Sequence, residues 1–329
     1  MFGFSNGNTS QNHGGGTAGL AERKHAKARI GLAFGSGAAR GWAHIGVLRA
    51  LEKIGIRPDI VVGTSIGAVV GSCYCAGLLD DLETFARRLT RRKVFGLLDV
   101  NFTGGGIFTG NKLTRLLEAE LGDTRIEDLN PAFVSVAAEL RTGHEIWIRR
   151  GRLVSAIRAS YAIPGLFQPI LLNGRWLVDG AIVNPIPVSV CRAFGAEIVI
   201  AVNLSSDMFG RGTVIHDHSA DMPEDQANEA LDAAGNMQQA RRSLQAQLID
   251  GSEGRPPGIS AVMIEAYNII QDRVARSRLA GDPPDVVVGP RLGRIGHFEF
   301  HRAGEAIDIG YQAGMRSAEE IRQVVDALT

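Results

Sequence analysis

The sequence predicts an α/β protein in which a central, mostly parallel sheet is flanked by helices on both faces. Short apolar runs typical of buried strands alternate with segments whose apolar residues recur at helical spacing. The 41 glycines among 329 residues cluster where tight turns are needed. With 45% hydrophobic and 21% charged residues, the composition is that of an ordinary globular protein.

The first part of the chain supplies two buried strands and four helices. Residues 29–37 are predicted to form a strand that runs into a glycine turn, and residues 58–65 form a second strand. Thr109 or Asn111 is expected to cap the fourth helix, which Gly122 ends. The four predicted helices lie within residues 40–55, 66–77, 80–93 and 109–122.

The second part adds two strand pairs, further buried strands and three helices. Residues 132–151 indicate two strands around Thr142–Gly143. Asn173–Gly174 is the strongest short signal for a hairpin, here within residues 168–181. The remaining strands are expected within 197–204 and 285–290, and the helices within 151–163, 259–281 and 301–328.

Composition divides the chain into four regions. Residues 1–27, rich in Gly, Asn and Ser, are expected to be a disordered tail, and residues 28–205 are expected to form the α/β body. The polar residues 206–258 are expected to be a flexible flap or insertion, and residues 259–329 supply helices and a strand that pack on the body. The start lacks the pattern of a signal peptide, and three cysteines read as buried thiols, so a cytoplasmic protein is expected.

A candidate nucleophile lies after the second strand. Gly63–Gly67 reads G-T-S-I-G and matches the G-x-S-x-G nucleophile elbow, in which a sharp strand-to-helix turn presents Ser65. The flanking glycines are needed because side chains there would collide with the neighbouring strand and helix. The N-terminus of the following helix favours a developing negative charge.

A membrane span is an alternative reading of the same region. Ile60–Leu79 carries no charge and is long enough to cross a bilayer. However, four glycines together with Thr64, Ser65 and Ser72 dilute its apolar content, and neither aromatic nor basic residues mark its ends. The strand and elbow are therefore the preferred interpretation.

A serine nucleophile needs hydrogen-bond donors for the oxyanion, and the first glycine loop is the candidate. This glycine loop, Gly35–Gly41 (G-S-G-A-A-R-G), lets backbone N–H groups converge, and Arg40 either locks it or adds positive charge. Dinucleotide binding is the alternative, but Arg40 stands where the third glycine of that motif belongs. A Walker A loop is absent from the sequence, so no cofactor is expected.

Asp179, in D-G-A after an apolar strand, is the candidate base. Together, S-G-A-A-R-G, G-T-S-I-G and D-G-A resemble the motifs of the patatin-like phospholipases, closest to their bacterial branch related to neuropathy target esterase. Residues 157–170 and 177–188 match especially well, and the resemblance extends over most of the chain.

The resemblance implies a three-layer patatin-like fold and a Ser–Asp dyad without a histidine. Ser65 would be the nucleophile and Asp179 the base, with Gly37 and Ala38 supplying oxyanion N–H groups beside Arg40. Ala38 stands where the family often has glycine, but its backbone donor is retained. Burial in a dry pocket would raise the pKa of the aspartate from about 3.9 and make it a better base.

A histidine triad is the alternative to the dyad. His216, His218, His297 and His301 follow Asp179 in the chain order of the α/β-hydrolases. The first two lie in the expected flap, and the others lie in or before the final helix, where surface or satisfied roles are commoner. The dyad is therefore preferred.

The resemblance also implies a lipid ester as substrate. Phe108, Ile163, Leu166 and Phe167 are expected to line an apolar acyl groove. Ala86–Lys93 puts five basic residues within seven positions, which would allow peripheral contact with anionic lipid at the inner membrane surface. A regulatory or lipid-binding protein with weak or no turnover is the alternative.

The remaining partners are constrained by charge and composition. The formal net charge is zero, so nothing draws the chain toward nucleic acid. Acidic clusters with calcium-loop spacing are absent from the sequence, so no metal is expected. The oligomeric state, the lipid headgroup and the acyl length are left open.

Overall fold

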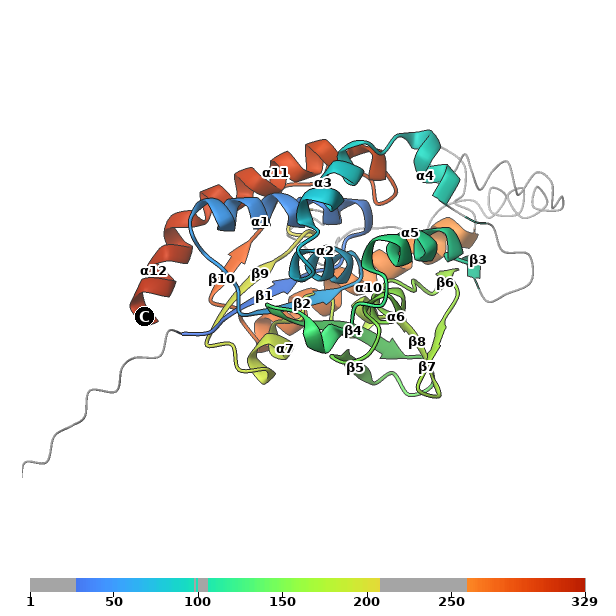
Figure 1. Ribbon diagram of the computed structural model, residues 1–329, viewed down its shortest axis with the longest axis horizontal. Helices are drawn as coiled ribbons and strands as arrows, with labels where there is room; N and C mark the ends of the chain where they lie inside the picture. The colour runs from blue at the N-terminus through green and yellow to red at the C-terminus, as the bar shows by residue number, and fades with distance from the viewer. Residues whose placement is uncertain (1–27, 98, 100–105, 208–258, 329) are drawn as a thin grey trace, which may run out of the picture.

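Five parallel strands form one side of the central sheet, and an antiparallel group completes it (Figure 1). The computed structural model describes residues 28–97, 99, 106–207 and 259–328. The expected tail, 1–27, and most of the expected flap, 206–258, lie outside these residues. The parallel strands, in order across the sheet, are β10 (Val286–Val288), β9 (Ile198–Val202), β1 (Ile30–Phe34), β2 (Ile60–Thr64) and β4 (Ala132–Glu139).

The antiparallel group contains the two predicted strand pairs. β4 pairs with β5 (Glu145–Ile148) and with β8 (Arg175–Asp179), and β8 pairs with β7 (Ile170–Leu172). Asn173 and Gly174 between β7 and β8 have φ values of 51° and 75°, as a two-residue hairpin turn requires. A separate two-stranded sheet joins β3 (Gly106–Phe108) to β6 (Gly165–Phe167).

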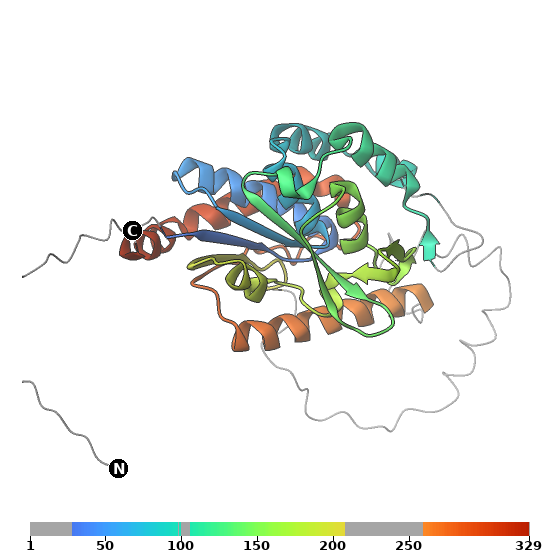
Figure 2. The same ribbon diagram turned by 60° about the horizontal axis from the view of Figure 1, so that its bottom comes forward.

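Helices cover both faces of the sheet, which confirms the predicted α/β class. In β1, Ile30, Leu32 and Phe34 enter one apolar core, whereas Ala33 enters the core on the other face. Figure 2 shows α10 on the opposite side of the sheet from α1 and α11. The first face carries α1 (Ala43–Lys53), α2 (Ile66–Cys75), α3 (Leu79–Arg87), α5 (Asn111–Leu121), α6 (Leu153–Ser160), α11 (Ala303–Arg316) and α12 (Ala318–Leu328), and the second carries α7 (Val188–Ala193) and α10 (Ile259–Gly281).

The first and last parts of the chain meet where α1 packs on α11. A Cβ added to Gly46 of α1 would lie 1.9 Å from the carbonyl oxygen of Ile307. A Cβ added to Gly310 of α11 would lie 2.0 Å from the carbonyl oxygen of Ala43. Glycine on both helices therefore allows their backbones to touch, which seats the C-terminal elements on the α/β body.

Two predicted helices are each divided in the structure. The segment 80–93 forms α3 and α4 (Arg91–Leu97), because the Thr90 hydroxyl accepts a hydrogen bond from the N–H of Lys93 and starts a new helix. The segment 301–328 forms a 3₁₀ turn, η4 (Phe300–Arg302), then α11 and α12, which are separated at Ser317.

The prediction that Thr109 or Asn111 caps α5 is confirmed only in part, because the Thr109 hydroxyl accepts from the N–H of Asn111 at 3.3 Å but Thr109 is not the N-cap residue. The N-cap residue is Gly110, and the carboxylate of Asp99 accepts from the N–H groups of Gly110 and Asn111 at 3.0 and 2.9 Å. Asp99 also accepts from the Thr109 hydroxyl. The capping carboxylate therefore lies twelve positions before the first helical residue, outside the reach of a local pattern.

Candidate active site

The C-terminal ends of β2 and β8 meet at one edge of β4. Val136 of β4 pairs with Thr64 of β2, and the next residue, Ala137, pairs with Asp179 of β8. β5 pairs with both of these β4 residues and so occupies the opposite edge. Because β2 runs parallel to β4 and β8 runs antiparallel to it, the two strands point at each other. Ser65, directly after β2, therefore lies beside Asp179.

Ser65 occupies the sharp turn between β2 and α2. Its φ of 58° and ψ of −124° are a conformation that side-chain-bearing residues rarely adopt. Its N–H donates to the hydroxyl of Ser160 at 2.9 Å, and that hydroxyl donates in turn to a β4 carbonyl. A Cβ on Gly63 would lie 2.4 Å from the carbonyl oxygen of Gly67, and one on Gly67 would lie 2.4 Å from that of Phe34. Close approach of backbones therefore excludes larger residues on both sides of the serine.

The Ser65 hydroxyl donates to the Asp179 carboxylate, with 2.5 Å between Oγ and Oδ2. The other carboxylate oxygen, Oδ1, accepts from the N–H of Ala181 at 2.9 Å. Ser65 is 5% exposed and Asp179 is fully buried. A hydroxyl bonded in this way to a buried carboxylate has a direct path for losing its proton.

Burial also changes the basicity of Asp179. Burial raises the pKa of this carboxyl from its ordinary 3.8 to about 7, because loss of hydration destabilises the charged carboxylate more than the neutral acid. Hydrogen bonds from the Ser65 hydroxyl and from the Ala181 N–H, and the proximity of the Tyr267 hydroxyl, oppose this rise. At neutral pH the group is thus partly ionised and is a much stronger base than an exposed aspartate.

The glycine loop contributes two backbone N–H donors to the cavity that contains Ser65. Gly37 and Ala38 line one small cavity with Ser65, and neither N–H donates to an acceptor within the described residues. Ala38 has a φ of 49°, which is strained for a residue with a side chain. Buried His44 steadies the loop, because its Nε2–H donates to the carbonyl oxygen of Gly35 at 2.8 Å.

Arg40 contacts the C-terminal part of the chain. Its Nε donates to the carbonyl oxygen of Ile295 at 2.6 Å, and its Nη1 donates to Nε2 of His297 at 3.1 Å. The N–H of the neighbouring Ala39 donates to the His297 carbonyl at 2.9 Å. Arg40 does not line the cavity beside Ser65, so of its two expected roles these contacts favour locking the loop.

The cavity at Ser65 has a volume of about 30 Å³, which is room for about one water molecule. α10 forms one wall of it through Tyr267, Asn268 and Gln271, which the sequence reading missed. These polar residues lie on the inner side of α10, whereas Val262, Met263, Ile269 and Ile270 of the same helix are exposed, so the hydrophobic pattern gave no signal that could have found them. Among the described residues, the lining is Gly37, Ala38, Ser65, Ile163, Ser205, Ile264, Tyr267, Asn268, Gln271, His297 and Phe298.

The four expected groove residues are only partly brought together with Ser65. Ile163 lines the cavity, whereas Phe108, Leu166 and Phe167 do not. Phe108 and Phe167 are paired across β3 and β6, with ring centroids 6.2 Å apart, and Leu166 is buried. These three residues form the apolar small sheet next to the cavity.

The histidines considered for a triad contact neither Ser65 nor Asp179 within the described residues. His297 lines the cavity, but burial and the Arg40 charge lower its pKa to about 3, so it is a weak base. His301 accepts a hydrogen bond from Arg91. The other two, His216 and His218, lie outside the described residues.

Comparison with known proteins agrees with this geometry. The family model for patatin-like phospholipases matches residues 32–192, a range that includes both Ser65 and Asp179. An uncharacterised NTE family protein of Mycobacterium tuberculosis is 33% identical over 92% of this chain and 94% of its own length. The chain belongs to the patatin-like phospholipase family.

Two further similarities involve longer proteins. The lysophospholipase NTE1 of Pyricularia oryzae is 28% identical over 89% of this chain, which corresponds to 18% of that protein. The crystal structure of VipD from Legionella pneumophila aligns with a TM-score of 0.43 at 12% identity, over 89% of this chain and 67% of that one.

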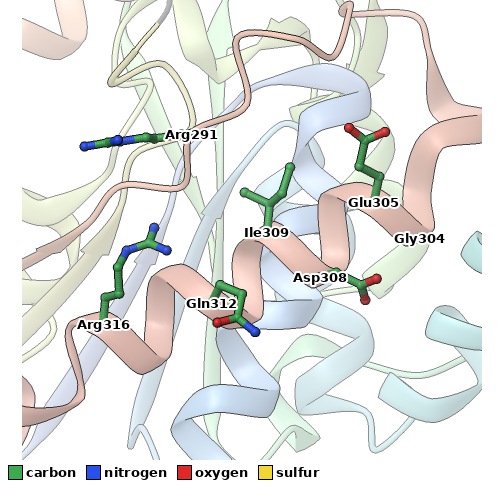
Figure 3. A pocket seen from close by; sticks show the side chains of 7 residues that line it. All are labelled: Arg291, Gly304, Glu305, Asp308, Ile309, Gln312 and Arg316. Atoms are coloured by element: carbon green, nitrogen blue, oxygen red, sulfur yellow. The ribbon is translucent and has the colours of Figure 1, made fainter.

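A larger hollow of this patatin-like phospholipase lies away from Ser65, on the outer side of α11. It has a volume of about 860 Å³, and Figure 3 shows Arg291 and Arg316 near one end with Glu305 and Asp308 toward the other. The hollow contains neither a serine nor a histidine among its lining residues.

The expected membrane-contacting segment is partly occupied by internal contacts in this family member. Arg87 binds Glu83 and Asp308, and Arg91 binds His301. Arg88, Arg92 and Lys93 are exposed. Within the described ranges, none of the helices combines the length and the apolar character that a bilayer span requires. The uncharged stretch 60–79 is divided between β2 and α2 and continues into the start of α3.

Proposed function

We propose that this chain hydrolyses carboxylic esters of phospholipids or lysophospholipids through a Ser65–Asp179 dyad and an acyl-enzyme. One observation carries the proposal: the 2.5 Å hydrogen bond from the Ser65 hydroxyl to a buried carboxylate, at a strained elbow. Membership of the patatin-like phospholipase family and similarity to proteins named lysophospholipases support the substrate class.

In the first half-reaction, Ser65 becomes acylated. Its Oγ attacks the ester carbonyl carbon while its proton passes to Oδ2 of Asp179. The resulting oxyanion accepts hydrogen bonds from the N–H groups of Gly37 and Ala38, and loss of one such donor typically costs about 10²–10³ in turnover. The intermediate then collapses, the bond to the leaving alcohol breaks, and that alcohol takes the proton from Asp179.

The second half-reaction returns the enzyme to its starting state. Asp179, again a carboxylate, accepts a proton from a water molecule as the water oxygen attacks the acyl carbonyl carbon. The same two N–H groups bind the second oxyanion. Collapse breaks the bond to Ser65 Oγ, which takes its proton back from Asp179, and the fatty acid leaves.

The acyl chain is proposed to enter past Ile163 toward the small sheet formed by Phe108, Leu166 and Phe167. These residues are apolar and lie next to the cavity, but a cavity of about 30 Å³ is far smaller than a fatty-acyl chain. We therefore propose that the wall formed by α10 shifts when substrate binds. Peripheral contact with anionic lipid is assigned to the exposed residues Arg88, Arg92 and Lys93.

A graded substrate panel tests this function. Lysophospholipids, phospholipids and p-nitrophenyl esters of increasing chain length are incubated with the wild type and with Ser65→Ala, Asp179→Asn and His301→Gln. We expect turnover by the wild type and by His301→Gln, and its loss in the other two variants. Absence of turnover in folded wild-type protein that still binds lipid would instead favour the regulatory or lipid-binding alternative.

A further inference from the structure

α10 supplies a side chain to the dyad from outside the segment that the family model matches. That segment ends at residue 192, whereas α10 begins at Ile259. The helix packs against η3 (Gly180–Ile182), the turn that directly follows Asp179. Its residues Ile264, Tyr267 and Gln271 recur at helical spacing and line the cavity that contains Ser65.

Tyr267 is the residue of α10 that reaches the carboxylate. Its hydroxyl oxygen is buried and forms no hydrogen bond of regular geometry within the described part of the chain. It nevertheless lies close enough to Asp179 to stabilise the charged carboxylate. Burial, and then the neighbouring negative charge, raise the pKa of this phenol, so it keeps its proton and acts as a donor.

The carboxylate has room for this donor. Two bonds of regular geometry reach it, from the Ser65 hydroxyl to Oδ2 and from the Ala181 N–H to Oδ1. A carboxylate offers about four acceptor positions. A third donor can therefore bind without displacing either of the first two.

Acylation makes this third donor important. In the acyl-enzyme, Ser65 Oγ is an ester oxygen without a proton, so its hydrogen bond to Asp179 no longer exists. The Ala181 N–H alone would then hold a buried carboxylate that must accept a proton from water. A buried charged group that loses a partner is strongly destabilised.

We propose that the Tyr267 hydroxyl is a positioning donor that holds the Asp179 carboxylate in place, above all during deacylation. This inference rests on the proposed function, because it assigns a role within the same reaction. It differs from the dyad mechanism itself, which needs no residue beyond position 192. Tyr267 acts through Asp179 and need not touch the substrate.

The kinetic test compares Tyr267→Phe with Tyr161→Phe. Both tyrosines have buried hydroxyls without a regular partner, but the groups near the Tyr161 hydroxyl are Thr114 and Arg158. With a p-nitrophenyl ester, Tyr267→Phe should lower the steady-state kcat about tenfold while the acylation burst keeps its amplitude. In the pH profile of kcat/KM, the acidic limb of this variant should shift to higher pH by on the order of one unit. Tyr161→Phe should do neither, and a Tyr267→Phe profile that overlays the wild type overturns the proposal.

The titrating group in this profile can be identified. The groups facing Asp179 are the Ser65 hydroxyl, the Ala181 N–H and the Tyr267 phenol, of which only the phenol ionises, at high pH. His297, the other titratable side chain of the cavity, has its pKa lowered to about 3. A limb near pH 7 therefore reports Asp179.

A second measurement needs no turnover, so it separates this inference from the proposed function. The Ser65→Ala variant lacks the serine hydroxyl, as the acyl-enzyme lacks its proton, and carbon-13 NMR titration of this variant measures the pKa of the Asp179 carboxyl. Adding Tyr267→Phe should raise the carboxyl pKa by on the order of one unit, even if the wild type hydrolyses no ester. An unchanged pKa overturns the positioning role while leaving the proposed function intact.

A labelled protein covers the case in which Tyr267→Phe fails to fold. Uniform 3-fluorotyrosine keeps all four rings and hydroxyls, and substituting the other three tyrosines identifies the Tyr267 fluorine signal. This signal should titrate together with Asp179 near pH 7. A signal that stays constant between about pH 5 and pH 9 overturns the contact.

Discussion

Asp179 is a carboxyl group that the fold keeps away from water. It is fully buried, and hydrogen bonds from the Ser65 hydroxyl and the Ala181 N–H do not restore its ordinary pKa. The serine beside it is equally constrained, since its backbone has a φ of 58° and its N–H is bound by Ser160. In the proposed function, the chemistry depends on a hydroxyl held by a strained backbone and on a poorly solvated base, both costly to hold in place.

The raised pKa predicts the pH dependence of catalysis. Asp179 must be ionised to accept the serine proton, and burial raises its pKa to about 7. We expect kcat/KM to be half-maximal near pH 7 and to fall about tenfold for each pH unit below that. A profile that is flat from about pH 5 to pH 8 would mean that the base has an ordinary carboxyl pKa.

The same shift predicts how stability depends on pH. A carboxyl whose folded pKa of about 7 exceeds its ordinary 3.8 contributes stability below the lower value and loses it as pH rises through the higher one. Asp179→Asn removes this loss. Measured by urea unfolding, the free energy of unfolding of the variant relative to that of the wild type should increase by up to about 4 kcal/mol between pH 4 and pH 8. A difference that does not change with pH would contradict this.

The elbow formed by β2 and α2 depends on two glycines. In Gly67→Ala the new methyl carbon would lie 2.4 Å from the carbonyl oxygen of Phe34. This oxygen belongs to the backbone, so the strand or the helix would have to shift to relieve the clash. We expect a loss of at least about 1–3 kcal/mol in the free energy of unfolding, measured with urea. Gly96→Ala in α4 is the control, because nothing lies within 4 Å of its added Cβ. Equal stability of both variants would show that the elbow is looser than described.

Local patterns predicted most elements but not how they begin and end. Short apolar runs were sufficient for most strands, and the Asn173–Gly174 turn for the β7–β8 hairpin, because both signals lie within the element itself. The three-residue strands β3 and β6 and the short helix α7 were not predicted. The division at Thr90 was missed because a threonine in a basic helical run can be either an interior residue or a cap. The capping of α5 by Asp99 was missed because its donor and acceptor are twelve positions apart.

At the scale of the whole molecule, α11 must lie directly on α1. Gly310→Ala would bring a methyl carbon 2.0 Å from the Ala43 carbonyl oxygen and force the helices apart. We expect the urea midpoint to fall, by at least about 1–3 kcal/mol in the free energy of unfolding. Gly304→Ala on the same helix is the control, since its Cβ would meet one flexible arginine atom at 3.4 Å. A Gly310→Ala variant as stable as this control would mean that the helices do not touch.

The arrangement of the candidate site could be predicted only in part. Ser65, Asp179 and the glycine loop were found because each carries a motif within a few residues. Their meeting depends on β4, whose single edge receives β2 and then β8, and no local pattern encodes this pairing. Tyr267 and the contact of Arg40 with His297 depend on the C-terminal region, more than 80 positions away from their partners. Such contacts follow from the assembled fold.

Covalent labelling determines whether Ser65 is a nucleophile that Asp179 activates. The wild type and Asp179→Asn are treated with a fluorophosphonate, and the modified residue is located by peptide mass spectrometry. The account predicts one adduct on Ser65 of the wild type and at least a hundredfold slower labelling of folded Asp179→Asn, on the order of the lower limit for general-base catalysis. An adduct on another residue, or equal labelling of both proteins, would contradict it.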